Sequence, residues 1–181
     1  DILVFGHENE GSARGPLYQA YTFLGSLLAS QFILDDHTNF QFFTADVVPG
    51  GGDEVVVGAY RESDGSFRVE VRAAGGALLA GRYVTGPAVS RHQIFPIDIS
   101  SHAGVEIGIG FAYEAANVSG DQTWRRNGAT LTQTSARSVL GKIFTGHQWG
   151  SCDFNGDGSG DVFVGAERTS DRAGVYVMRD G

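Results

Sequence analysis

A spacing of about 52 residues between similar segments constrains this chain more than any other feature. Short apolar segments that end in glycine recur along the sequence, at intervals of 52, 52 and 55 residues. These segments are ILVFG, EVVVG, EIGIG and DVFVG, which end at Gly6, Gly58, Gly110 and Gly165. Self-similarity at a fixed period is typical of repeat architectures. We therefore expect a row of similar structural units.

A second marker keeps the same period. FQFFTAD, HQIFPID and HQWGSCD place Gln41, Gln93 and Gln148 in register, again at intervals of 52 and 55 residues. We expect the three extra residues of the last interval in a loop at NVSGDQTW, residues 117–124. The repeat units then cover approximately residues 1–39, 40–90, 91–145 and 146–181 of a single β-propeller segment.

Each unit reads as four short strands. In the second unit these are FQFFTADV, DEVVVGAY, SFRVEVRA and ALLAGRYV. Residues 55–57 are apolar at every position, which indicates a strand that is covered on both faces. Four-stranded sheets repeating at this length are typical of propeller blades. We predict an all-β propeller of four-stranded antiparallel blades, and the absence of long 3.6-residue periodicity argues against a helical solenoid.

The strand count predicts an open segment of a ring. The chain would supply the last three strands of one unit, two complete units and the first three strands of a fourth, about three and a half blades. Because propellers close to hide their edge strands, we expect the rest of the ring in a longer polypeptide or in partner chains. A ring of seven blades would need about twice this length.

The composition and net charge of the chain exclude several classes of binding partner and structural feature. The formal net charge of −8 and the lack of a basic run make nucleic acid and anionic membranes poor partners and favour cations. Cys152 is the single cysteine, so an intrachain disulfide framework is excluded. No apolar run reaches membrane-spanning length, and no signal peptide is visible.

The segment CDFNGDGSGDVFVGAE carries the clearest chemistry. Its oxygen-bearing side chains occupy positions 1, 3, 5, 7 and 9 of a glycine-rich loop: Asp153, Asn155, Asp157, Ser159 and Asp161. Hard oxygen ligands of this number suit Ca²⁺, with a backbone carbonyl and water completing the shell, whereas Mg²⁺ prefers fewer protein ligands. An EF-hand would need Glu at position 12, where Val164 stands. The simpler alternative is an Asn-Gly or Asp-Gly hairpin turn.

The equivalent loops of the two preceding units are degraded. The second unit has Asp46 and Glu54 at positions 1 and 9 but Val48 and Gly50 between them, and we expect no calcium there. The third unit keeps Asp98, Ser100 and Glu106 with His102, which makes it a weaker possible metal loop. The end acids of both loops can instead cap the hairpin by accepting backbone N–H bonds.

These segments resemble the FG-GAP repeats, also called VCBS repeats, of integrin α-subunit propellers and bacterial surface proteins. The resemblance lies in DFNGDGSGDVFVGAE, in its degraded copies DVVPGGGDEVVVGAY and DISSHAGVEIGIGFA, and in the later AGVYVMRDG. Departures are the missing Pro after GA and the lost ligands of two loops. The resemblance implies a seven-bladed propeller with calcium in blade hairpins, usually extracellular and used for adhesion or ligand recognition.

Other candidate binding residues stand outside the acidic loop. Gln41, Gln93 and Gln148 could line equivalent binding sites or the central channel, or could satisfy backbone groups where blades meet. Trp124, beside two arginines, is expected at the surface as a candidate for stacking on sugars, whereas Trp149 is expected in the core. His7, Glu8 and Glu10 form a loop that could bind a metal or a sugar, with a solvated loop as the alternative, and Asn117 begins a glycosylation sequon.

Three functions remain open. The first is a non-enzymatic extracellular recognition or adhesion module, an integrin-like segment with structural Ca²⁺ that binds protein or carbohydrate. The second is the propeller part of a larger secreted hydrolase or lyase whose catalytic residues lie outside this chain or in the His7 loop. The third is a lectin that binds carbohydrate in equivalent grooves between blades.

Overall fold

The computed structural model describes residues 2–7, 17–22, 24–32, 34, 36–85, 91–99, 103–113, 118–140, 144–168, 170–172 and 174–179. Within these ranges the chain forms fourteen strands and no helix. The strands of the first half are β1 (Ile2–His7), β2 (Leu17–Thr22), β3 (Leu27–Phe32), β4 (His37–Ala45), β5 (Glu54–Arg61), β6 (Phe67–Arg72) and β7 (Leu78–Thr85). Those of the second half are β8 (Arg91–Ile97), β9 (Glu106–Tyr113), β10 (Val118–Asn127), β11 (Thr130–Leu140), β12 (Phe144–Cys152), β13 (Asp161–Arg168) and β14 (Gly174–Arg179).

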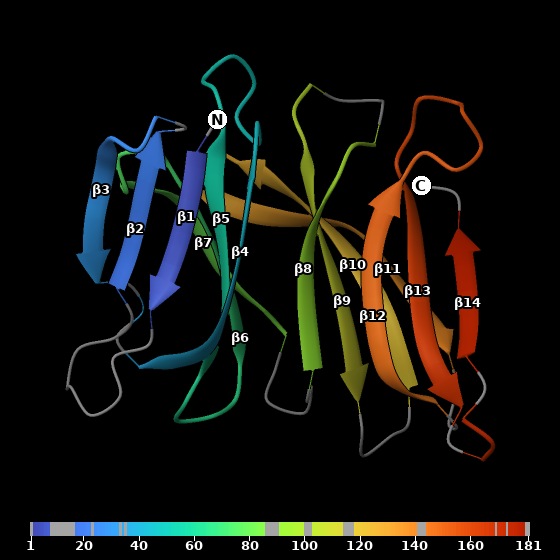
Figure 1. Cartoon of the computed structure of the whole chain (residues 1–181). Helices are drawn as coiled ribbons and strands as arrows, with labels where there is room; N and C mark the ends of the chain where they lie inside the picture. The colour runs from blue at the N-terminus through green and yellow to red at the C-terminus, as the bar shows by residue number, and fades with distance from the viewer. Residues whose placement is uncertain are drawn as a thin grey trace. The chain divides into compact units, whose positions relative to one another are not determined.

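The strands form four sheets in which each strand pairs with its neighbour in the sequence (Figure 1). The sheets contain β1–β3, β4–β7, β8–β11 and β12–β14. The expected all-β class and the division into three, four, four and three strands are therefore confirmed for the part of the chain that the structure describes. Strands of such length and pairing suit blades, and the closure of a ring remains a prediction.

The two sequence markers are cross-strand partners. Gln41 pairs with Gly58, Gln93 with Gly110, and Gln148 with Gly165, each between the first two strands of a sheet that contains both markers. The two markers thus recur together because they occupy facing positions of one hairpin. This shared register also allows residues of different sheets to be compared position by position.

The expected loop at residues 117–124 is wrong. Val118 to Trp124 belong to β10 and pair in unbroken register with β9. Gly58 pairs with Val69 and Gly110 with Asp121, so the corresponding hairpins of the two sheets have equal length. The three extra residues therefore lie after Asp121, in a region where β10 and β11 are longer than β6 and β7. The polar composition of the segment indicated a loop, but its alternating side chains fit a strand.

The chain divides into two compact units. The first contains Asp1–Pro87 with Arg126–Leu131, and the second contains Ala88–Arg125 with Thr132–Gly181. In the first unit Val55 and Val57 of β5 pack with Ala20 and Ala29. This core joins the sheet of β1–β3 to that of β4–β7.

The second unit has its own core between two sheets. Phe95 and Ile97 of β8 pack with Trp149 of β12 and with Val162 and Val164 of β13. The sheets approach closely because glycine stands where a side chain would intrude: a Cβ built on Gly110 would lie 2.0 Å from Cδ2 of Trp149. Burial of the apolar side chains between the sheets supplies the main stabilising free energy.

Candidate functional site

The candidate metal loop connects β12 to β13 and stands at one end of their sheet (Figure 1). Cys152 and Asp161 are the last cross-strand pair before the loop. Gly156 and Gly158 have φ values of +76° and +87°, a left-handed conformation that glycine adopts without strain. The glycines thus allow the loop to fold back on itself within eight residues.

The acidic and amide side chains of this loop accept hydrogen bonds from its own backbone. Asp153 Oδ1 accepts from Gly156 N–H at 2.7 Å, and Asp153 Oδ2 accepts from Gly158 N–H at 2.9 Å. Asn155 Oδ1 accepts from Asp157 N–H at 2.9 Å. Such side-chain to backbone bonds bend the loop into successive turns.

Asp161 closes the base of the loop. Its side chain is only 2% exposed, and Oδ2 accepts a hydrogen bond from Phe154 N–H at 2.9 Å. Asp157 Oδ1 accepts from Ser159 N–H at 2.8 Å. One acid is therefore fixed at the strand end, while Asp153 and Asp157 remain exposed to solvent.

The donor set of this loop fits a calcium ion chemically. Three carboxylates, one amide oxygen and the oxygens of Ser159 are hard ligands at alternating positions, and exposed carboxylates can bind a cation without first breaking a buried ion pair. Among the described residues, no three His, Cys, Asp or Glu side chains gather closely enough to hold a metal by themselves. The amide of Asn155 and a backbone carbonyl would therefore have to contribute.

The end acids of the degraded loops act as hairpin caps. Glu54 Oε2 accepts from Val48 N–H at 2.9 Å, and Glu106 Oε2 accepts from Ile99 N–H at 3.1 Å. Burial raises the pKa of Glu54, although the bond from Val48 opposes this rise. The predicted capping role is confirmed for both acids.

Glu106 has a second partner that bears on the Asp98 loop. Arg125 Nε donates to Glu106 Oε1 at 3.1 Å, and the Glu106 side chain is 1% exposed. Glu106 is therefore a buried carboxylate held in an ion pair with Arg125, which a calcium ion would have to break, and this argues against Glu106 as a calcium ligand. Ser100 and His102, the other candidates of this loop, lie outside the described residues.

The metal loop contacts the loop of the neighbouring sheet within the second unit. Gly160 N–H donates to the backbone carbonyl of Asp98 at 2.5 Å, and Ser151 Oγ donates to the carbonyl of Pro96. A Cβ on Gly160 would lie 2.8 Å from the Asp98 oxygen. This glycine therefore permits the two loops to approach and to share a backbone hydrogen bond.

Gln93 satisfies backbone groups where two sheets meet. Its Nε2 donates to the carbonyl of Trp149 at 2.7 Å, and its Oε1 accepts from Trp149 N–H at 3.0 Å. The structural interpretation of this repeated glutamine is confirmed for Gln93. Gln41 is half-buried in β4, and Gln148 is exposed on β12.

The two tryptophans are both buried. Trp149 lies in the core of the second unit, as expected. Trp124 is 3% exposed, and its Nε1 donates to Gln122 Oε1 at 2.8 Å, so the expectation of a surface-exposed stacking residue is wrong. Because neighbouring side chains of a strand point to opposite faces, the arginine at position 125 says nothing about the exposure of Trp124.

A polar cluster of the first unit was missed by sequence reasoning. His37 Nδ1 lies 2.5 Å from Asp36 Oδ1, and His37 Nε2 lies 3.3 Å from the hydroxyl of Tyr83. Arg61 Nε donates to the same hydroxyl at 2.9 Å, and the Arg61 guanidinium stacks on the Tyr83 ring at 4.0 Å. Burial lowers the pKa of His37, and Asp36 opposes this effect. The repeat pattern did not indicate this cluster, because the next repeat does not keep its residues. Val89 and Tyr113 stand at the positions 52 residues after His37 and Arg61.

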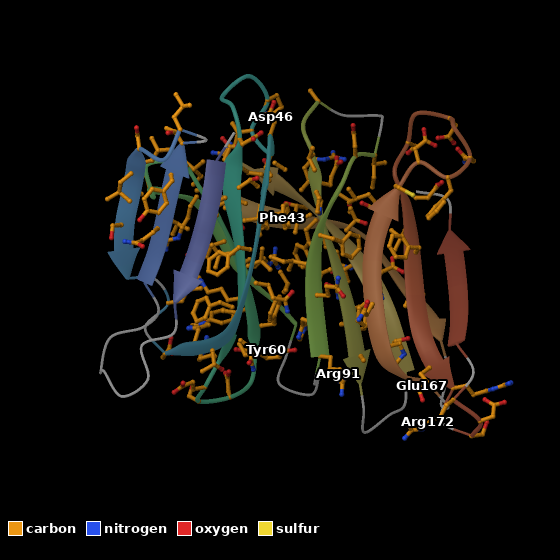
Figure 2. The ribbon with its side chains drawn as sticks, in the orientation of Figure 1. Phe43, Asp46, Tyr60, Arg91, Glu167 and Arg172 are labelled. Carbon is orange, nitrogen blue, oxygen red and sulfur yellow. The ribbon has the colours of Figure 1, made fainter. Side chains whose placement is uncertain are left out.

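Figure 2 labels several side chains that lie near the ends of β4, β5 and β13. Asp46 lies at the loop end of β4, whereas Tyr60 lies toward the opposite end of β5. Glu167 and Arg172 lie near the end of β13 that is distant from the metal loop, with Arg172 Nε 3.5 Å from Glu167 Oε1. This exposed pair is worth little stabilisation.

Other candidates fall outside the described residues. These are Glu8 and Glu10 of the His7 loop, whose His7 side chain is likewise not described, and Asn117 of the sequon. Within the described ranges, no helix is long and apolar enough to cross a membrane. Comparison with known proteins found no matching family model and no matching curated protein.

Proposed function

We propose that this chain is a segment of a calcium-stabilised propeller that serves as a non-enzymatic extracellular recognition or adhesion module, as in FG-GAP repeat proteins. The observation that carries the proposal is the loop from Asp153 to Asp161. Its side-chain oxygens alternate, its glycines adopt left-handed turns, and its exposed carboxylates face solvent. Further support comes from sheets that stack within each unit through shared cores.

The proposed role of the metal is structural. All its ligands come from one continuous loop, and the Gly160 bond to Asp98 joins that loop to the neighbouring sheet. A bound cation would offset the mutual repulsion of Asp153, Asp157 and Asp161 and hold the hairpin in one conformation. The loops on the same face would then form a surface of fixed shape to which a protein or carbohydrate ligand binds.

The test is the thermal midpoint of the chain in calcium and in EGTA. A ligand at about 100 times its dissociation constant stabilises the folded state by about 2.7 kcal/mol. For a chain of this size that free energy corresponds to about 5–10 °C in thermal midpoint. We expect a shift of this order for the wild type and none for Asp157→Ala, because the variant lacks one carboxylate ligand.

A matched control is Asp53→Ala in the degraded loop of the second repeat. This loop lacks the middle ligands, so the variant should keep the full calcium response. An identical melt of the wild type in calcium and EGTA would show that the Asp153 loop holds no calcium under these conditions, and the metal role would be abandoned.

A further inference from the structure

One face of β10 carries an unusual strip of buried polar side chains. Ser119, Asp121 and Thr123 alternate along the strand, so they lie on one face, and each is at most 3% exposed. Across the hairpin, Asp121 pairs with Gly110, against which the Trp149 ring packs. This polar face is therefore turned toward the sheet of β12–β14 within the second unit.

The same positions are apolar in the second repeat. Phe67, Val69 and Val71 of β6 stand 52 residues before Ser119, Asp121 and Thr123, and all three are fully buried. The registers agree, because Val69 pairs with Gly58 as Asp121 pairs with Gly110. The repeat fold thus accepts a conventional apolar strip here. Burying polar groups instead costs free energy, so the substitution calls for a role beyond folding.

The exchange of large apolar for smaller polar side chains is accompanied by a cavity. A space of about 210 Å³ lies in the second unit beside the strip. Thr123, Thr134 and Ser135 are among its lining residues, and Ile97 and Val162 contribute apolar side chains. The Thr134 hydroxyl donates to the backbone carbonyl of Thr123 at 3.1 Å. At about 30 Å³ per water molecule, the cavity has room for roughly seven waters or one small ring.

Two further buried polar atoms stand at the inner end of the strip. Among the described residues, Ser119 Oγ and Trp149 Nε1 have no hydrogen-bond partner. Ser119 precedes Asp121 on the same face, and the Trp149 ring lies against Gly110 opposite Asp121. Because buried polar groups of native proteins are almost always satisfied, these atoms indicate water between the sheets, although neither residue lines the cavity itself.

The charges of the lining select the chemistry of the ligand. Arg125, at the rim, is balanced by Glu106, to which its Nε donates. An anion would therefore find Arg125, the one cationic side chain among the described residues of the lining, already paired with a carboxylate. A carboxylate can accept hydrogen bonds from the hydroxyl groups of a ligand, and side-chain hydroxyls can donate to them or accept from them. The apolar side chains of the lining suit the C–H face of a ring.

We infer that this cavity binds a small neutral polyhydroxylated molecule, a single sugar ring or a cyclic polyol. The inference rests on the recognition function proposed above and gives it a site and a ligand class, although it does not require the metal. Hydroxyl groups of the ligand would bond Asp121 and Thr123, and its ring would lie on Ile97 and Val162.

The experiment is saturation-transfer NMR on the whole 181-residue chain. The probes are myo-inositol and the methyl glycosides of glucose, galactose, mannose and N-acetylglucosamine. We expect saturation transfer to at least one probe and about tenfold weaker binding by Thr123→Val, the loss expected for one hydrogen bond. This variant should fold, since valine stands at the equivalent position 71.

Asp121→Asn keeps the shape of the side chain and should also weaken binding. The control is Thr132→Val, on an exposed position of β11 outside the cavity, which should bind as the wild type does. Absence of transfer to every probe, or binding as strong as that of the wild type by both cavity variants, would overturn the inference. Repeating the measurement in EGTA separates the two proposals, because an empty metal loop alters the melt without abolishing transfer.

Discussion

At the scale of single residues, Gly110 decides how closely two sheets can pack. Its Cβ position lies 2.0 Å from the indole of Trp149, a distance that no side chain can occupy. We expect Gly110→Ala to lower the free energy of unfolding by about 3 kcal/mol, the upper range for overpacking a core. Urea denaturation monitored by the fluorescence of the two buried tryptophans, Trp124 and Trp149, would measure it.

The matched control is Gly75→Ala, where a Cβ would meet nothing within 4 Å. Its free energy of unfolding should change by less than about 0.5 kcal/mol. If both substitutions lowered the free energy of unfolding equally, the cost at Gly110 would come from the general effect of replacing glycine on the backbone. The contact with Trp149 would then not be its cause.

His92 makes stability depend on pH. The side chain is 6% exposed, and burial lowers its pKa from 6.5 to about 3. Below pH 6.5 His92 is protonated in the unfolded chain but stays neutral in the folded chain. The free energy of unfolding therefore falls as the pH falls toward 3. The loss is about 1.4 kcal/mol per pH unit, or roughly 2 kcal/mol between pH 6.5 and 5.

The measurement is urea denaturation at pH 6.5 and pH 5 for the wild type and His92→Gln. The variant should lose most of the difference between the two pH values, because it cannot be protonated there. His147→Gln, at a half-buried position, should retain it. A wild-type stability that is flat over this range would contradict the buried neutral histidine.

Residue roles were predicted from the sequence only where a position repeats. Gly110 and Gln93 stood out as repeat markers, yet the reason for the glycine, an indole from another sheet, is a tertiary contact. Trp124 was placed at the surface because its neighbours are arginines. The alternation of the strand places the buried Trp124 on one face, while Arg125 pairs with Glu106 on the other.

At the scale of elements, Gln93 holds two strands of different sheets together. Its amide bonds both the N–H and the carbonyl of Trp149. We expect Gln93→Ala to lower the free energy of unfolding by about 2–3 kcal/mol, because two backbone groups lose their partner in a region with little solvent. Chemical denaturation followed by circular dichroism would measure the change.

The sequence itself offers the control for this prediction. Gln148 occupies the same register position in its hairpin but is exposed, so Gln148→Ala should change the free energy of unfolding by less than about 0.5 kcal/mol. A large effect of Gln148→Ala would indicate that this glutamine already has a partner, such as a strand of a further sheet.

Most strands and hairpins could be predicted because the residue types along the sequence match the burial that each segment has in the fold. Buried strands such as β5 combine β-branched residues with glycine-rich flanks, and the loop acids Glu54 and Glu106 cap their hairpins as expected. β10 was misread because strand propensity depends on what covers each face. A polar strip looks like a loop unless the facing sheet is known.

At the scale of the whole molecule, period and strand count predicted the all-β fold and the four sheets. The cavity could not be predicted, since it arises from the difference between two repeats and from the approach of two sheets. A position-by-position comparison of β6 and β10 would have indicated it: a repeat that exchanges Phe67, Val69 and Val71 for Ser119, Asp121 and Thr123 has lost apolar volume.

The bond pattern of Gln93 also bears on how such a chain can change over generations. Both of these hydrogen bonds join its amide to main-chain atoms of residue 149, and every residue other than proline offers the same N–H and carbonyl. The two Gln93 bonds therefore do not depend on which side chain stands at position 149, although the Trp149 indole itself packs in the core beside Gly110. A change of side chain at this position would thus alter the packing between the two sheets and still leave both main-chain bonds to Gln93 available.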